Sequence, residues 1–179
     1  MKILKKILIV LAILLTIPLI VALFVGKDYA VERQILINKP KAEVFGYLKL
    51  IKNQDNFSKW AMMDPDMKKS YNGTDGTVGF ISSWESTNEE VGQGEQEIKK
   101  ITDGERLDLE LRFIKPFEST EKAYMTTEAI SDNQTKVKWG FKGHMDYPTN
   151  ITLLFLDFEQ LIGGDLQTGL ERLKAQLEQ

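Results

Sequence analysis

Alternation of apolar and polar residues with a period of two constrains the fold of this chain more than any other feature. It recurs in about six stretches between residues 69 and 142, and it is cleanest over residues 106–113, where apolar and charged side chains alternate without a break. Such alternation is typical of a half-buried β-strand, with one apolar face and one face in water. Turns rich in Gly, Asn and Asp separate the stretches, so the sequence predicts an antiparallel meander that buries one face.

The last thirty residues, Thr149 to Gln179, supply an element that can cover this face. Large apolar residues recur there at steps of three and four, which predicts a helix with one apolar stripe. The members of the stripe are Leu154, Phe158, Leu161, Ile162, Leu166, Leu170, Leu173 and Leu177. Gly163-Gly164 weakens the pattern and divides it into a mobile part, 149–162, and a gripped part, 165–177. Gly169 lies near the centre of the stripe, which predicts either close backbone approach or space for a ligand.

The N-terminus contains nineteen consecutive uncharged residues, Ile7 to Val25. A helix of that length covers about 28 Å, close to the ~30 Å hydrocarbon core of a bilayer. Lys2, Lys5 and Lys6 precede it and no basic cluster follows, which predicts a cytoplasmic N-terminus. We therefore expect residues 1–26 to form an uncleaved, single-pass signal-anchor in the cell membrane, with a domain at 27–179 on the extracytoplasmic side. A cleaved signal peptide is the alternative, although its apolar region is ordinarily shorter.

Composition excludes several classes of site. The chain has no cysteine, so it has neither disulfides nor a thiolate nucleophile. Of its 23 basic residues three precede the apolar run, which leaves 20 against 26 acidic residues in the rest of the chain. A domain with that negative balance lacks the clustered Lys and Arg that nucleic-acid binding needs, so no nucleic-acid partner is expected.

Four stretches together resemble the SRPBCC superfamily, which includes START-like, polyketide cyclase/dehydrase and lipid-transport proteins. They are ILINKPKAEVFGYL, TDGTVGFISSWES with the following GQGEQEI, and IGGDLQTGLERLK, within a resemblance that covers about Tyr29 to Glu178. The resemblance implies an α+β helix-grip fold, in which a curved antiparallel sheet of about six or seven strands wraps around the long C-terminal helix. It also implies a cavity between helix and sheet that often takes an apolar ligand.

The side chains predicted to face that cavity are mainly aromatic, with a few polar groups that could orient a ligand. The predicted ligand-binding residues are Phe80, Ser82, Trp84, Gln96, Phe113, Met125, Thr127, Trp139, Phe141, Phe158 and Gly169. The alternative for the aromatic and methionine residues is an ordinary packed core, because the same side chains suit either role.

Motifs for catalysis or metal binding are not evident. His144, the only histidine, is expected on the outer face or in a loop, which does not suit a triad or a His-based metal site. Residues 73–79 resemble a phosphate loop but precede a strand, so a turn is predicted. Asp64-Pro65-Asp66 also reads as a turn rather than a calcium loop. We therefore name no catalytic residues, no metal and no cofactor.

The sequence thus favours membrane-anchored binding or transport of a small hydrophobic or lipid-like ligand. One alternative is an enzyme of the cyclase or dehydrase kind, which is disfavoured because the acidic residues Glu95, Glu97, Asp108 and Glu110 alternate outward. The other is a protein-interaction module without a ligand, which would use the rim of the sheet or the apolar turn at 151–158.

Overall fold

The computed structural model describes residues 2–179. The chain divides into two compact units. The first contains the residues up to Tyr29 together with His144–Phe158, and the second contains Ala30–Gly143 together with Glu159–Gln179.

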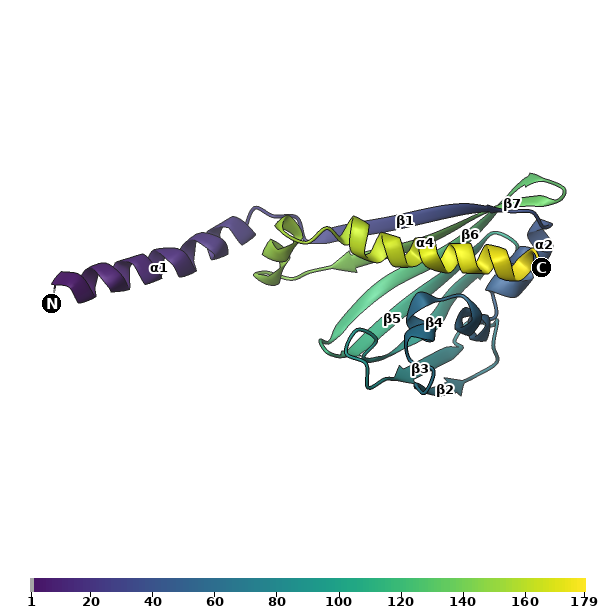
Figure 1. Ribbon diagram of the computed structural model, residues 1–179, viewed down its shortest axis with the longest axis horizontal. Helices are drawn as coiled ribbons and strands as arrows, with labels where there is room; N and C mark the ends of the chain where they lie inside the picture. The colour runs from purple at the N-terminus through teal and green to yellow at the C-terminus, as the bar shows by residue number, and fades with distance from the viewer. Residues whose placement is uncertain (1) are drawn as a thin grey trace. The chain divides into compact units, whose positions relative to one another are not determined.

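A seven-stranded antiparallel sheet forms most of the second unit (Figure 1). Its strands, in sequence order, are β1 (Asp28–Ile37), β2 (Lys68–Asn72), β3 (Ile81–Glu85), β4 (Gln93–Thr102), β5 (Arg106–Lys115), β6 (Ser119–Ser131) and β7 (Gln134–His144). Strands β2 to β7 pair consecutively, and β1 joins the sheet beside β7. This arrangement confirms the predicted meander and places the first and last strands next to each other.

The long helix α4 (Phe158–Leu177) lies across one face of this sheet (Figure 1). Leu166, Leu170 and Leu173 face the sheet and are at most 1% exposed. The opposing sheet residues share this inner face, and a buried cluster of Phe80, Ile98, Leu107, Leu109, Ala123 and Ile51 forms part of the core. The helix-grip fold expected from the sequence is therefore confirmed.

Three short helical elements connect β1 to β2. They are α2 (Lys41–Leu48), the 3₁₀ helix η1 (Ile51–Asn56) and α3 (Lys59–Met63). The loop between β2 and β3 holds the start of η1, because the Asp75 carboxylate accepts hydrogen bonds from the backbone N–H groups of Ile51 at 2.8 Å and Lys52 at 3.1 Å. The run resembling a phosphate loop is thus a turn between two strands, and its acidic residue caps a helix.

The predicted C-terminal helix is wrong in its first part, and its predicted division lies at the wrong place. Residues 149–154 form a separate 3₁₀ helix, η2 (Thr149–Leu154), and α4 begins at Phe158. The break therefore precedes Gly163-Gly164, and both glycines are helical. Gly163 lies against the Arg33 guanidinium, which also binds Glu159, and a Cβ atom at Gly163 would overlap Arg33 Nη2. Because Gly163 has no side chain, there is room beside it for the ion pair between Arg33 and Glu159. The helix continues through this glycine without a break.

The first unit is built around helix α1 (Lys2–Ala22), which contains Pro18. It is the one helix within residues 2–179 that is long and apolar enough to cross a membrane, a property that signal sequences share. The 3₁₀ helix η2 belongs to the same unit. Asn150 of η2 is fully buried, and its side-chain amide donates hydrogen bonds to the carbonyl oxygens of Ala22 at 2.8 Å and Val25 at 3.0 Å.

Candidate ligand-binding site

A row of polar side chains crosses the inner face of the sheet. The strand register places Ser82 of β3 opposite Gln96 of β4, Gln96 opposite Leu111 of β5, and Leu111 opposite Glu121 of β6. Residues directly opposite each other in antiparallel strands share a face, with Cβ atoms about 4.5–5.5 Å apart. Ser82, Gln96 and Glu121 therefore all project to the side of the sheet that α4 covers.

An aromatic wall lies two residues along the strands from this row. Trp84 of β3 and Phe113 of β5 contact each other edge to face, with ring centroids 6.0 Å apart. Gly94 of β4 lies between them, and a Cβ atom there would lie 2.7 Å from Cζ2 of Trp84. The glycine thus lets the indole lie across β4, and a hydrogen bond of 3.2 Å from Trp84 Nε1 to the Val91 carbonyl holds its other side.

The packed core bounds the polar row on its opposite side. Phe80, Ile98 and Leu109 continue the same face in that direction and are at most 3% exposed. Ser82, Trp84, Gln96 and Phe113 retain accessible surface, as does Phe141, which pairs with Ala123. The inner face therefore changes from a closed core to a partly open surface at the row that carries the polar groups.

Gln54 of η1 reaches this row from outside the sheet. Its side chain is 7% exposed, and its Oε1 accepts a hydrogen bond of 3.0 Å from Gln96 Nε2. Its Nε2 is buried without a hydrogen-bond partner among the described residues. A buried donor without an acceptor costs about 1–3 kcal/mol, so this atom favours a ligand that accepts a hydrogen bond.

Glu121 is an acidic residue that the sequence prediction missed. It lies on the inner face and is 7% exposed, whereas the acids predicted to point outward do so. Glu95, Glu97 and Glu110 gather around the Arg112 guanidinium on the outer face, with N–O distances of 2.6, 2.7 and 2.5 Å. The sequence did contain a signal for it. The alternation that places Ala123 and Met125 on the inner face, extended two residues back, also places Glu121 there.

The other predicted site residues lie in closed or separate surroundings. Trp139 is 5% exposed and Met125 1%, and the Thr127 hydroxyl donates to the Gly104 carbonyl at 2.9 Å. At Gly169 a Cβ atom would lie 2.6 Å from Trp139 Cζ3, so the indole occupies the volume that the glycine leaves. Phe158 belongs to the first unit, where its ring centroid lies 4.6 Å from that of Tyr29.

The outer face carries a hollow of about 310 Å³, which is lined by polar residues. Tyr124 at its centre donates a 2.5 Å hydrogen bond to Glu32, and the Arg106 guanidinium lies 4.1 Å from the Tyr124 ring centroid. Burial, with the Glu32 hydrogen bond second, raises the pKa of Tyr124 to about 12. Lys138 also pairs with Glu32, so these charges neutralise one another across neighbouring strands.

Asp64-Pro65-Asp66 forms the expected turn. The Asp64 carboxylate accepts hydrogen bonds from the Asp66 N–H at 3.1 Å and from the Ser86 hydroxyl at 2.5 Å, which fixes the start of β2 beside the loop after β3. Throughout residues 2–179, no group of three or more His, Asp or Glu side chains could hold a metal ion.

His144 lies exposed at the end of β7, in the first unit. Its Nδ1 is 2.7 Å from Asp28 Oδ1, and its Nε2 is 3.4 Å from Asp146 Oδ1. The hydrogen bond that His144 donates to Asp28, with Asp146 contributing less, raises the pKa of His144 above its ordinary value of about 6.5.

We expect an NMR titration of this single imidazole to give a pKa above 6.5 in the full chain, and a lower value in Asp28→Asn. Because the folded-state pKa is raised, the ion pair's contribution to stability is complete below the unfolded pKa and is lost as pH rises through the folded one. A pKa at or below the ordinary value would contradict the contact.

No protein-family model matches the sequence, and no curated protein matches it. Solved structures match its fold. Norcoclaurine synthase from Thalictrum flavum superposes with a TM-score of 0.63 at 8% identity, over 89% of this chain and 91% of that one. The Aha1 dimer from Colwellia psychrerythraea gives 0.57 at 14% identity, over 84% and 96%. Ara h 8.0201 gives 0.53 at 13% identity, over 83% and 99%. These similarities identify the Bet v1-like helix-grip fold.

Proposed function

We propose that this chain binds a small, largely apolar molecule with a hydrogen-bond-accepting group, and that its N-terminal helix holds it to a membrane. The ligand would lie on the inner face of the sheet, between the Trp84–Phe113 wall and the core. A hydrophobic or lipid-like molecule with one polar end fits this arrangement, because the apolar surfaces flank a single polar row.

The observation that carries the proposal is the buried, unpaired Nε2 of Gln54. The fold already uses Oε1 of the same amide to accept from Gln96, so the amide is fixed with its donor free. A carbonyl, carboxylate or phosphate oxygen would complete its hydrogen bonding. The aromatic wall would then contact the apolar part of the ligand.

The fold comparison supports this kind of ligand. One matching structure is norcoclaurine synthase in complex with dopamine and hydroxybenzaldehyde, which are small aromatic molecules with polar substituents. Shared fold does not transfer a ligand, since function depends on the residues of the site. The support is that a helix-grip scaffold can hold such a molecule, as the resemblance to the SRPBCC superfamily also implies.

The membrane part of the proposal rests on α1. Its uncharged length suits a bilayer, and the three lysines at its start favour a cytoplasmic N-terminus, with the folded residues after it on the extracytoplasmic side. Tethering would keep the site close to lipids and thus raise their effective concentration.

Photolabelling of the full chain in nanodiscs tests the proposal. The probe is a palmitate analogue with a diazirine in its chain, and labelled peptides are mapped by mass spectrometry. We expect labels on β3, β4 and β5, and a roughly 3–10-fold weaker apparent affinity in Gln54→Leu, the effect of one lost hydrogen bond. The variant removes the unpaired donor but also the acceptor of Gln96 Nε2, so the two effects offset and its unfolding temperature should stay close to that of the wild type.

Gln34→Leu is the matched control, since Gln34 is an exposed amide of β1. It should leave labelling of β3 to β5 unchanged. Labels confined to α1, or equal labelling of the wild type and Gln54→Leu, would contradict binding at this site.

A second function is favoured by Glu121. A carboxyl group buried on the inner face could act as general acid or base, which the enzyme alternative requires. Glu121→Gln would then abolish turnover of a bound carbonyl compound while leaving the affinity for the photoprobe unchanged. If the wild type and Glu121→Gln bind the photoprobe equally well and the wild type shows no turnover, the enzyme alternative is contradicted and ligand binding remains the proposed function.

A further inference from the structure

The first unit exposes a concentration of large apolar side chains from two segments far apart in sequence. Leu23 and Phe24 follow α1 and are 66% and 85% exposed. Leu154 ends η2, Phe155 and Leu156 follow it, and the three are 55%, 79% and 48% exposed. We call these five residues the apolar tip.

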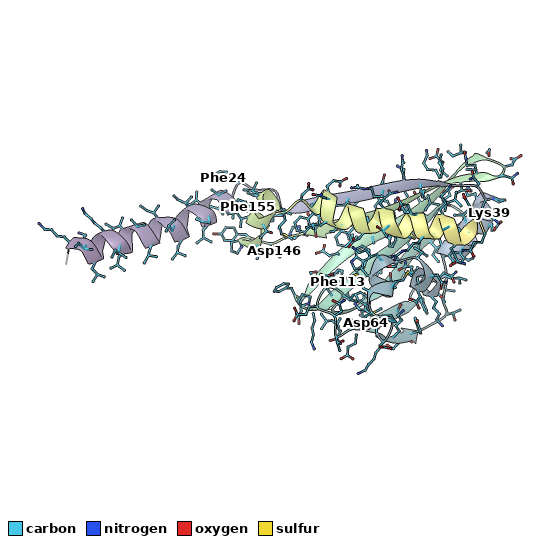
Figure 2. The ribbon with its side chains drawn as sticks, in the orientation of Figure 1. Phe24, Lys39, Asp64, Phe113, Asp146 and Phe155 are labelled. Carbon is cyan, nitrogen blue, oxygen red and sulfur yellow. The ribbon has the colours of Figure 1, made fainter. Side chains whose placement is uncertain are left out.

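Asn150 joins the two halves of the apolar tip. Its fully buried amide donates to the carbonyl oxygens of Ala22, the last residue of α1, and of Val25, three residues beyond it. Helix η2 is therefore fastened to the end of the helix proposed to span the membrane, and Figure 2 shows that Phe24 and Phe155 both lie at this junction.

The η2 segment suits a medium with little water. Residues 147–156 contain no charged side chain. The Thr149 hydroxyl donates to the Asp146 carbonyl at 2.6 Å, and the Thr152 hydroxyl to the Thr149 carbonyl at 2.8 Å. The N–H groups of Phe155 and Leu156 both donate to the Thr152 carbonyl. Polar groups satisfied internally in this way lower the cost of leaving water.

Charged residues of the same unit pair with one another next to this segment. Lys27 lies 3.7 Å from Asp146, and His144 contacts both Asp28 and Asp146. Paired charges and Tyr29 thus follow directly after the apolar tip. Groups lie in the same order across a membrane interface, where apolar side chains reach the acyl region and charged groups remain in water.

We propose that η2 and the two residues after it form a second membrane contact, in which Leu154, Phe155 and Leu156 enter the lipid at the headgroup boundary beside the end of α1. The proposal rests on the membrane anchoring proposed above. The bilayer is the partner that covers the apolar tip, because the Asn150 hydrogen bonds fasten this surface to the helix proposed to span the membrane. The depth expected for such a surface is about 5–10 Å into the headgroup and acyl boundary.

Depth-dependent quenching in vesicles tests the proposal. Since the chain has no cysteine, single variants Phe24→Cys, Phe155→Cys and Val78→Cys of the full chain can each be labelled with the environment-sensitive dye NBD. The vesicles contain phosphatidylcholine and phosphatidylglycerol, with doxyl-labelled phosphatidylcholine as the quencher. All three positions are exposed, so labelling leaves the packed core intact.

We expect the doxyl lipid to quench the labels at 24 and 155, with a blue shift at both, and to leave the label at 78 unquenched. Quenching at 24 without quenching at 155 overturns the second contact and leaves the anchor in place. Absence of quenching at both positions overturns the anchor and the contact together. A blue shift at 155 that the doxyl lipid does not quench assigns the surface to a second copy of the chain, and equal quenching at 78 overturns the specific role of η2.

Discussion

Replacing Trp139 by alanine is expected to destabilise the fold by about 3–5 kcal/mol, the range for a large aromatic removed from a core. The indole is 5% exposed, and its ring centroid lies 5.6 Å from that of Phe57 and 6.2 Å from that of Trp60. It also fills the space beside Gly169 of α4. The substitution therefore opens a cavity where helix, sheet and connecting helices meet, and urea unfolding followed by circular dichroism measures the loss.

Trp84→Ala provides the comparison for this prediction. Trp84 is also an inner-face tryptophan, but it retains accessible surface at the open end of the sheet. Its removal should cost clearly less stability and should weaken binding of the palmitate probe, whereas Trp139→Ala should act on stability first. Equal losses of stability in the two variants would contradict the division of the inner face into a closed and an open part.

Alanine at two glycines of α4 is expected to have opposite effects. At Gly169 the new Cβ would lie 2.6 Å from the buried Trp139 ring, and overpacking of this kind costs about 1–3 kcal/mol. A gain of up to about 1 kcal/mol in helix propensity only partly offsets it. At Gly164 an added Cβ would meet no atom within 4 Å apart from the backbone of its own helix, so Gly164→Ala should stabilise by about 0.5–1 kcal/mol.

The same urea titration measures both glycine variants, and each serves as the control for the other. They change the same atoms in the same helix, so the difference in their signs reports only on the neighbouring side chains. Stabilisation by Gly169→Ala would mean that the helix lies further from Trp139 than the structure places it, which would restore the space for a ligand at that position.

The strands were predictable because their signal is local. The alternation over residues 106–113 follows from the pleat alone, and it corresponds to β5 with its apolar residues on the inner face. The C-terminal helix was predicted less well, because a helical stripe shows which residues align and not what they meet. Leu154 and Leu161 belong to the stripe by spacing, yet both are more than half exposed.

The candidate site needed contacts between distant segments. Only the register of three strands places Trp84 over Gly94 and against Phe113. Gln54 lies in a short 3₁₀ helix without a sequence pattern, so its contact with Gln96 could not be anticipated. The close approach of the Arg33 guanidinium to Gly163 could not be predicted either, since 130 positions along the chain separate the two residues.

Native mass spectrometry of the full chain, purified from membranes in a mild detergent and released from its micelle, tests ligand binding most directly. We expect the wild type to retain a bound lipid-like molecule and Gln54→Leu, prepared in parallel, to retain less of it. The Gln34→Leu control should match the wild type. A wild-type chain that carries no ligand, and that acquires none after incubation with membrane extract, would contradict the proposed function.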